Sequence, residues 1–127
     1  MDIKINNTLY PASVRTIAAE HAWGNRQSKA ITLKMDHATA SALFVDELVW
    51  STVQTFVSEK MRRSEDGEPV LDENGIIVYD TEEHTVETDM SDYCVAGTIT
   101  DNRDGTVTVK MGKPTDAELL AILMGGN

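Results

Sequence analysis

The chain has 127 residues, of which 41% are hydrophobic and 25% are charged, values typical of one folded domain rather than a disordered chain. We therefore expect a single domain over residues 1–127. The net charge is −10, and it is local: Ser64 to Asp92 holds eleven acidic side chains and no Lys or Arg. Such a stretch repels phosphate groups, so we expect no nucleic-acid partner.

The cellular compartment is indicated by what the sequence lacks. No apolar run approaches the length that spans a bilayer, and the opening residues MDIKINNTLY do not follow the basic-then-apolar order of a signal peptide. We expect a protein of the cytoplasm with no membrane partner. Cys94 is the only cysteine, which excludes an internal disulfide and a cysteine-cluster zinc site.

The N-terminal segment IKINNTLY predicts a strand, a tight turn and a second strand, because Asn6 and Asn7 tolerate left-handed backbone. We expect this hairpin to end at Tyr10 and Pro11, since proline cannot continue a central ladder. Over the next residues, up to the turn-like WGNRQS, helical and strand spacing are both present and a strand is favoured.

The middle of the chain predicts two strands and a helix. AITLKM alternates apolar and polar residues, which is typical of a half-buried strand. Asp36 then precedes an alanine-rich stretch and predicts a capped helix over about residues 37–45. LVWSTVQTFV is rich in β-branched and aromatic residues on both alternating faces, so we expect a central strand that is buried on both sides, with Trp50 in the core.

Residues 60–92 differ in character from the rest of the chain. They combine DG and NG turn signals, a high density of carboxylates and few apolar residues. We expect an acidic β-hairpin arm that is less well anchored than the rest of the domain.

The clearest hairpin signal lies near the C-terminus, where two period-2 apolar runs flank a short polar loop. We expect Tyr93, Val95 and Ile99 on one face of the first strand. The second strand should present Val107, Val109 and Met111 in the same way.

The loop between these strands contains Asp101, Asp104 and Gly105, and it raises the question of a calcium site. An EF-hand loop needs oxygen ligands at its positions 3 and 5 and a glutamate at position 12, where this chain has Arg103, Gly105 and Gly112. We therefore predict a structural turn with Gly105 in the left-handed region and no metal.

The last predicted element is a helix of two to three turns. Thr115 and Glu118 form a capping box at its start, and Gly125 and Gly126 follow its end. Its apolar residues exceed one narrow stripe, so the helix is either packed deeply against the sheet or exposed for a partner. The candidate interaction surface comprises Leu119, Leu120, Leu123 and Met124.

Together these elements predict an α+β fold: a mainly antiparallel β-sheet or small barrel with one short internal helix and a C-terminal helix. No nucleophile elbow, phosphate loop, dinucleotide fingerprint or zinc-ligand spacing is present in the sequence. We expect no enzymatic activity, no catalytic residue and no cofactor.

Three stretches carry a resemblance: WGNRQSKAITLKM, ALFVDELVWSTV and DYCVAGTITDNRDGTVTVKMGKPTDAELLAIL. They resemble small proteins encoded in prophages of gut Firmicutes, commonly near tail and baseplate genes. The opening IKINNTLYP is similar to the I-x-I-N-G-x-x-Y-P hairpin at the start of phage tail-associated proteins, with Asn7 in place of the glycine. That family has no established activity, so the resemblance implies a phage-derived structural or accessory protein and transfers no site residue.

The sequence thus predicts a non-enzymatic protein of virion assembly that acts in the tail, whose partners are other phage structural proteins or itself. We expect it to be cytoplasmic in the host and to associate with the virion. Two alternatives stay open. One is an acidic decoy that imitates DNA toward a basic host protein, and the other is a module whose acidic arm binds cations.

Overall fold

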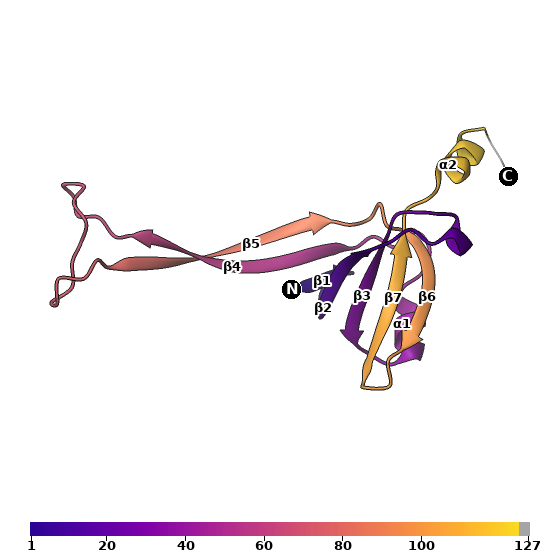
Figure 1. Ribbon diagram of the computed structural model, residues 1–127, viewed down its shortest axis with the longest axis horizontal. Coiled ribbons are helices and arrows are strands. Elements are labelled where there is room, and N and C mark those ends of the chain that lie inside the picture. The colour runs from indigo at the N-terminus through magenta and orange to yellow at the C-terminus, as the bar shows by residue number, and fades with distance from the viewer. Residues whose placement is uncertain (125–127) are drawn as a thin grey trace. The chain divides into compact units, whose positions relative to one another are not determined.

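The computed structural model describes residues 1–124 (Figure 1). The chain divides into two compact units. Met1–Val53 together with the chain from Glu87 onward forms the first, called here the core unit, and Gln54–Val86 forms the second, called here the ribbon. The glycines predicted to follow the C-terminal helix, Gly125 and Gly126, lie outside the described residues.

The secondary structure is mostly an antiparallel sheet of seven strands in the order β5-β4-β1-β2-β3-β7-β6, with two short α-helices. The sheet is not closed, so of the two predicted architectures the open sheet is found and the barrel is not. The elements are β1 (Asp2–Ile5), β2 (Thr8–Ile17), a 3-10 turn (His21–Trp23), β3 (Ser28–Lys34), α1 (His37–Leu43), β4 (Ser51–Met61), β5 (Tyr79–Asp89), β6 (Val95–Asp101), β7 (Thr106–Gly112) and α2 (Asp116–Leu123).

The predicted N-terminal hairpin is present, and its turn is formed by Asn6 and Asn7, with φ of 51° and 63°. The pairing of the two strands ends at Pro11, as predicted, while β2 itself continues to Ile17, in agreement with the strand favoured there. β2 pairs with β1 as far as Pro11 and with β3 from Ala12 onward. Pro11 therefore lies where the strand changes partners.

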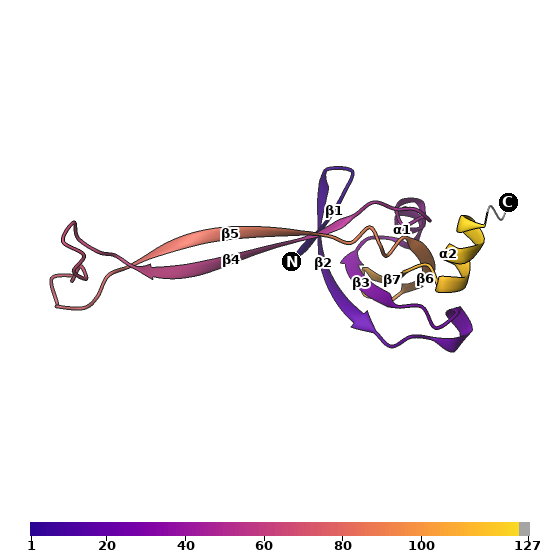
Figure 2. The same cartoon turned by 90° about the horizontal axis from the view of Figure 1, so that it is seen from above.

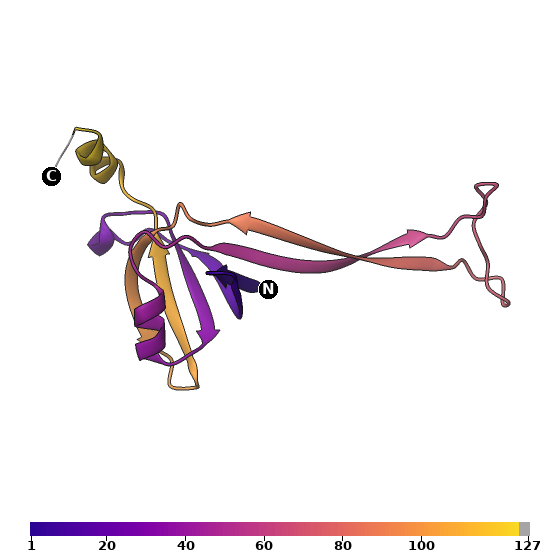
Figure 3. The ribbon, with the colours of Figure 1, turned by 180° about the vertical axis from the view of Figure 1, so that it is seen from behind.

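The predicted helix after Asp36 is α1, which ends two residues earlier than expected. Its N-cap is confirmed, since Asp36 Oδ1 accepts a hydrogen bond of 2.7 Å from the Thr39 amide. The pKa of the Asp36 carboxyl lies below the ordinary value, first because of the interaction with the Thr39 side chain and then because of the bond from the Thr39 amide. α1 packs against β6 and β7, and Figure 3 shows it lying along these strands.

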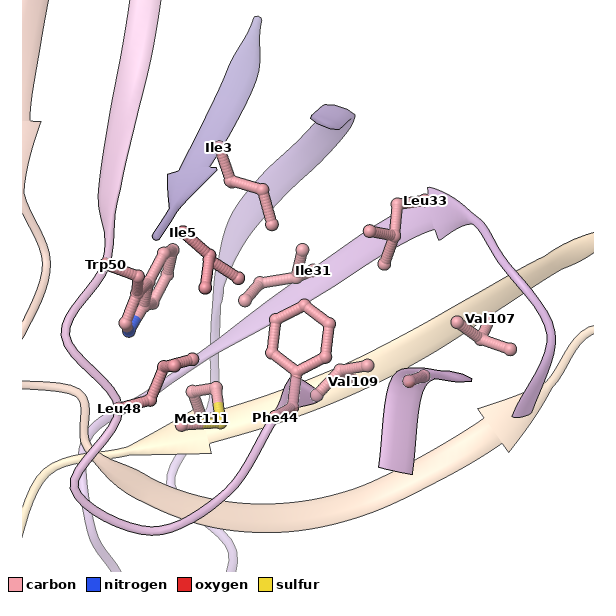
Figure 4. Packing of buried hydrophobic residues seen from close by; sticks show 11 residues of the cluster. Ile3, Ile5, Ile31, Leu33, Phe44, Leu48, Trp50, Val107, Val109 and Met111 are labelled. Carbon is pink, nitrogen blue, oxygen red and sulfur yellow. The ribbon is translucent and has the colours of Figure 1, made fainter. Parts of the chain in front are cut away.

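The hydrophobic core lies within the core unit, between α1 with its following loop and the strands β1, β3 and β7. Seen from above, β2, β3, β7 and β6 follow one another along a curve (Figure 2). Figure 4 shows Phe44 directed toward Ile31 and Val109, and Trp50 beside Ile5. The core residues are Ile3, Ile5, Ile31, Leu33, Ala40, Phe44, Leu48, Trp50, Val107, Val109 and Met111.

Trp50 is 1% exposed, as expected of a core residue, but the prediction of a strand buried on both sides was wrong for the residues after it. β4 begins at Ser51, and its side chains from Gln54 to Val57 are exposed, with Val57 at 63%. β-branched and aromatic residues favour extended backbone in any strand, so their density did not distinguish a central strand from a two-stranded ribbon.

The C-terminal hairpin is formed by β6 and β7, as predicted, and Val107, Val109 and Met111 are buried. The face assigned to Val95 was wrong. A register shift between Ala96 and Ile99 makes Ala96, instead of Val95, the neighbour of Met111 that packs on the core. One extra residue in a strand reverses the side-chain alternation beyond it.

The ribbon, Gln54–Val86, consists of the paired outer parts of β4 and β5 and an irregular tip. Figure 1 shows the two strands running side by side and ending in open loops. Within the tip there are two isolated β-bridges, Arg63 with Pro69 and Leu71 with Ile77.

Candidate interaction surface

The start of α2 is held firmly to the core unit. Thr115 and Glu118 form the predicted capping box, in which each side chain accepts a hydrogen bond from the other residue's amide. Arg26, whose side chain is only 10% exposed, has its Nη1 atom 2.8 Å from Glu118 Oε1, and the same atom donates to the Lys113 carbonyl. The position and direction of α2 are therefore fixed by named contacts.

These contacts also affect the titration of Glu118. The pKa of its carboxyl lies below the ordinary value, first because of the hydrogen bond from the Thr115 amide and then because of the one from Arg26. The negative charge also lies in the first turn of α2, where it is favoured by the helix dipole. At neutral pH the carboxylate therefore acts as a stable link between helix and core unit.

The body of α2 contrasts with its start, because no residue of the helix is buried. All four residues of the predicted interaction surface are exposed, from 45% for Leu119 to 83% for Leu123. Of the two possibilities that the sequence left open, exposure rather than deep packing is found. Ile122, which the prediction did not include, is exposed as well. The α2 surface is defined here as Leu119, Leu120, Ile122, Leu123 and Met124.

Two lysines close to the start of α2 share one aromatic ring. The ammonium groups of Lys29 and Lys113 lie 5.4 and 5.1 Å from the centroid of the Tyr93 ring. Lys29 also donates a hydrogen bond of 2.6 Å to Thr16 Oγ1. Within residues 1–124 neither lysine forms an ion pair with a carboxylate. This lysine pair is a site of uncompensated positive charge.

The sequence did not indicate the lysine pair, because Lys29, Tyr93 and Lys113 are far apart in the chain. The fold brings them together through β3, which pairs with β7 so that Lys29 lies opposite Met111, two residues before Lys113. Only the register of this strand pair, which no local pattern encodes, could have revealed it.

The loop with Asp101, Asp104 and Gly105 is a turn held by its own side chains. Asp101 Oδ1 accepts from the Arg103 amide at 2.9 Å, and Asp104 Oδ1 accepts from the Thr106 amide at 3.0 Å. The hydrogen bonds from Thr106 lower the pKa of Asp104. Gly105 has a φ of 89°, in the left-handed region. The aspartate oxygens are thus directed at backbone donors of the loop.

A surface hollow of about 670 Å³ lies among Lys4, Trp50, Ser51 and Glu87. Its charges compensate one another, since Lys4 Nζ is 3.6 Å from Glu87 Oε1, which also accepts a hydrogen bond from Ser51. Among residues 1–124 no three side chains of His, Cys, Asp or Glu are grouped as a metal site would require. None of the described helices is both long and apolar enough to cross a membrane.

Comparison with protein-family models, with curated proteins and with solved structures finds no match for this chain. The geometry described above therefore carries the functional argument. The α2 surface is apolar and exposed, and the lysine pair forms no ion pair with a carboxylate of the described residues.

Proposed function

We propose that this protein is a non-enzymatic assembly protein that acts by binding other proteins through the α2 surface. The observation that carries the proposal is the combination of a fixed helix start with an exposed apolar body. Clustered apolar side chains on a surface are typical of protein–protein interfaces. A helix whose direction is already set loses less entropy when it docks than a mobile segment would.

The resemblance to prophage-encoded proteins of the tail and baseplate region supports a place in virion assembly. In this proposal the partners are other phage structural proteins or further copies of this chain, and the protein moves from the host cytoplasm into the particle. Neither nucleic acid nor membrane takes part. The chemistry consists of contact alone, without catalysis or cofactor.

The test is mass spectrometry of particles purified after prophage induction in the native host. We expect the wild-type protein in the particles, retained through a high-salt wash because apolar contacts resist screening. Leu120→Asp with Leu123→Asp places two charges on one side of α2 and should remove the protein from the particles. Leu9→Asp with Val49→Asp, two similarly exposed positions outside α2, is the matched control. Particles that lack the wild-type protein would refute the proposal.

The acidic decoy is the less favoured alternative, because the ribbon also carries Lys60, Arg62 and Arg63. Arg62 Nε donates a hydrogen bond of 2.9 Å to Asp80 Oδ1, and this contact neutralises the Asp80 carboxylate. A phosphate mimic would need that carboxylate to be free. Binding to a basic host protein that weakens steeply with salt would support the decoy instead.

A further inference from the structure

The ribbon has no core of its own. Not one of the residues 54–86 is buried, and most are exposed. A two-stranded hairpin is at best marginally stable in water, since such hairpins need a third strand or a packed face. The side chains of the ribbon therefore offer extended surface to another molecule.

One face of the ribbon is satisfied by its own contacts. The rings of Phe56 and His84 stack with centroids 5.2 Å apart, and the His84 Nε2 atom is hydrogen-bonded to the Ser58 hydroxyl at 2.7 Å. Further along, Arg62 pairs with Asp80. On this face an aromatic and a polar side chain of β4, and a charged side chain just after β4, thus each contact a side chain of β5.

The opposite face is apolar and acidic. The hydroxyls of Thr55 and Thr85 are hydrogen-bonded at 3.3 Å, so these residues share a face, and strand alternation then adds other residues to it. It contains Val57 and Tyr79, both more than half exposed, together with the carboxylates of Glu59 and Glu83. Neither glutamate forms an ion pair with any described cation. We call this the acidic face.

The core unit carries the complementary surface. The α2 surface is apolar, and the lysine pair beside the start of α2 supplies two uncompensated positive charges. Only Pro114 and Thr115 lie between Lys113 and the first residue of α2, so apolar and cationic groups adjoin along the chain. An apolar partner with two unpaired carboxylates matches both parts of this surface.

We propose that the α2 surface and the lysine pair of one copy bind the acidic face of the ribbon of a second copy. This inference rests on the proposed assembly function and names one partner for it. Pairing of two ribbons with each other is disfavoured, because it would bring Glu59 and Glu83 against like charges. The contact joins two different surfaces, so a dimer still has one α2 surface and one acidic face free, and further copies can join head to tail.

The test is sedimentation velocity of the purified full-length protein over a concentration series. We expect association that increases with concentration. Glu59→Lys with Glu83→Lys reverses the acidic face, and Lys29→Glu with Lys113→Glu reverses the lysine pair. Each double variant alone should associate at least roughly tenfold more weakly, because like charges then oppose each other in the contact.

A mixture of the two double variants gives the decisive result. Contacts between the two different variants join opposite charges, whereas contacts between copies of the same variant do not, so an equimolar mixture should associate as alternating copies to near the wild-type level. Two controls make the same net charge changes elsewhere: Glu65→Lys with Glu82→Lys in the ribbon, and Arg15→Glu with Lys34→Glu in the core unit. Both controls should associate like the wild type.

A wild-type protein that stays monomeric at every concentration would overturn the inference, as would a mixture that fails to associate. Glu59 and Glu83 are exposed and unpaired, so the double variant of these two glutamates should stay folded even if the double variant of the lysine pair unfolds. The glutamate variant then tests the contact alone. A monomeric protein that is nevertheless present in particles would refute this contact and leave the assembly function standing.

Discussion

Trp23 closely constrains the backbone of the two strands beside it. A Cβ atom on Gly97 would lie 2.6 Å from Trp23 Cη2, and one on Gly112 would lie 3.0 Å from the same atom. The indole therefore rests directly on the backbone of β6 and β7, where any larger residue would push it away. Arg26 lies over the other part of the ring, with its guanidinium carbon 5.2 Å from the centroid.

Gly97→Ala should destabilise the core unit by about 1 to 3 kcal/mol, because the ring must shift from its packed position. Urea unfolding followed by circular dichroism measures the loss. In a Trp23→Ala background most of this penalty should vanish, since the clashing atoms are gone. An equal cost in both backgrounds would show that the ring is not responsible.

Gly105→Val tests the turn between β6 and β7. A Cβ atom there meets nothing within 4 Å, so the effect comes from backbone conformation alone. A side chain at a φ of 89° costs about 1 to 2 kcal/mol, and a β-branched one is the least tolerated. Gly105→Asn should cost clearly less, because asparagine adopts this region more readily. A valine variant with the wild-type melting temperature would contradict the turn.

At the scale of the element, α2 combines a fixed start with an unpacked body. The capping box and Arg26 supply polar contacts at the first turn, while none of the apolar side chains is buried. The helix is therefore stabilised locally at one end, and the far end depends on intrinsic helix propensity. Changes at Glu118 should therefore alter the fraction of molecules in which α2 is helical, and they should leave the hydrophobic core unaffected.

Acid should weaken α2. The pKa of Glu118 is lowered in the folded chain, so its stabilising effect is complete above the ordinary value of 4.5 and is lost as the pH falls through the lower folded value. Cα chemical shifts of residues 119–122 report the helix population during such a titration. Glu118→Gln keeps the side-chain geometry without the charge, so its helix population should change less between pH 6 and pH 3.

Truncation after Lys113 removes α2 and leaves the lysine pair. The hydrophobic core ends at Met111 and receives no side chain from α2, so the truncated protein should unfold cooperatively at nearly the wild-type temperature. Self-association should be lost. A chain that unfolds on truncation would show that α2 contributes to the core, and a stable, unchanged oligomer would exclude α2 from the contact.

At the scale of the whole molecule, the two units differ in what holds them together. The core unit has buried side chains from β1, β3, β7 and α1, whereas the ribbon has none. Replacing residues 54–86 with a two-residue Asn-Gly turn should therefore leave the thermal unfolding of the core unit nearly unchanged. A loss of cooperative melting would show that the ribbon supports the core.

In the intact chain, limited proteolysis should cut first within the ribbon tip.

Local rules were sufficient to predict the elements that local residues determine. Asn6 and Asn7 at a tight turn, Asp36 at an N-cap and Thr115 with Glu118 in a capping box all act within a few residues. Predictions that needed distant neighbours were wrong. Neither the bulge that turns Ala96 toward the core nor the exposure of β4 is encoded by the pattern of a single strand.

The interaction surfaces, too, divide into one that local residues determine and others that depend on distant neighbours. The apolar residues of α2 were visible in the sequence because a short helix with few polar positions is unusual on its own. The lysine pair and the acidic face were not visible in the sequence, since each depends on which strands pair and in which register. The charge composition indicated that the ribbon is negatively charged, but it did not indicate on which face of the ribbon the carboxylates are unpaired.

The open tip of the ribbon also bears on how this protein could vary in length. Its two tight turns, closed by the Gly67 and Gly75 amides, lie among residues that support no buried side chain. Lengthening a flexible loop costs little free energy, so insertions and deletions at these turns should be nearly neutral for folding. The tip is therefore the natural place to graft an epitope or fluorophore, and the part of the chain in which related proteins should differ most.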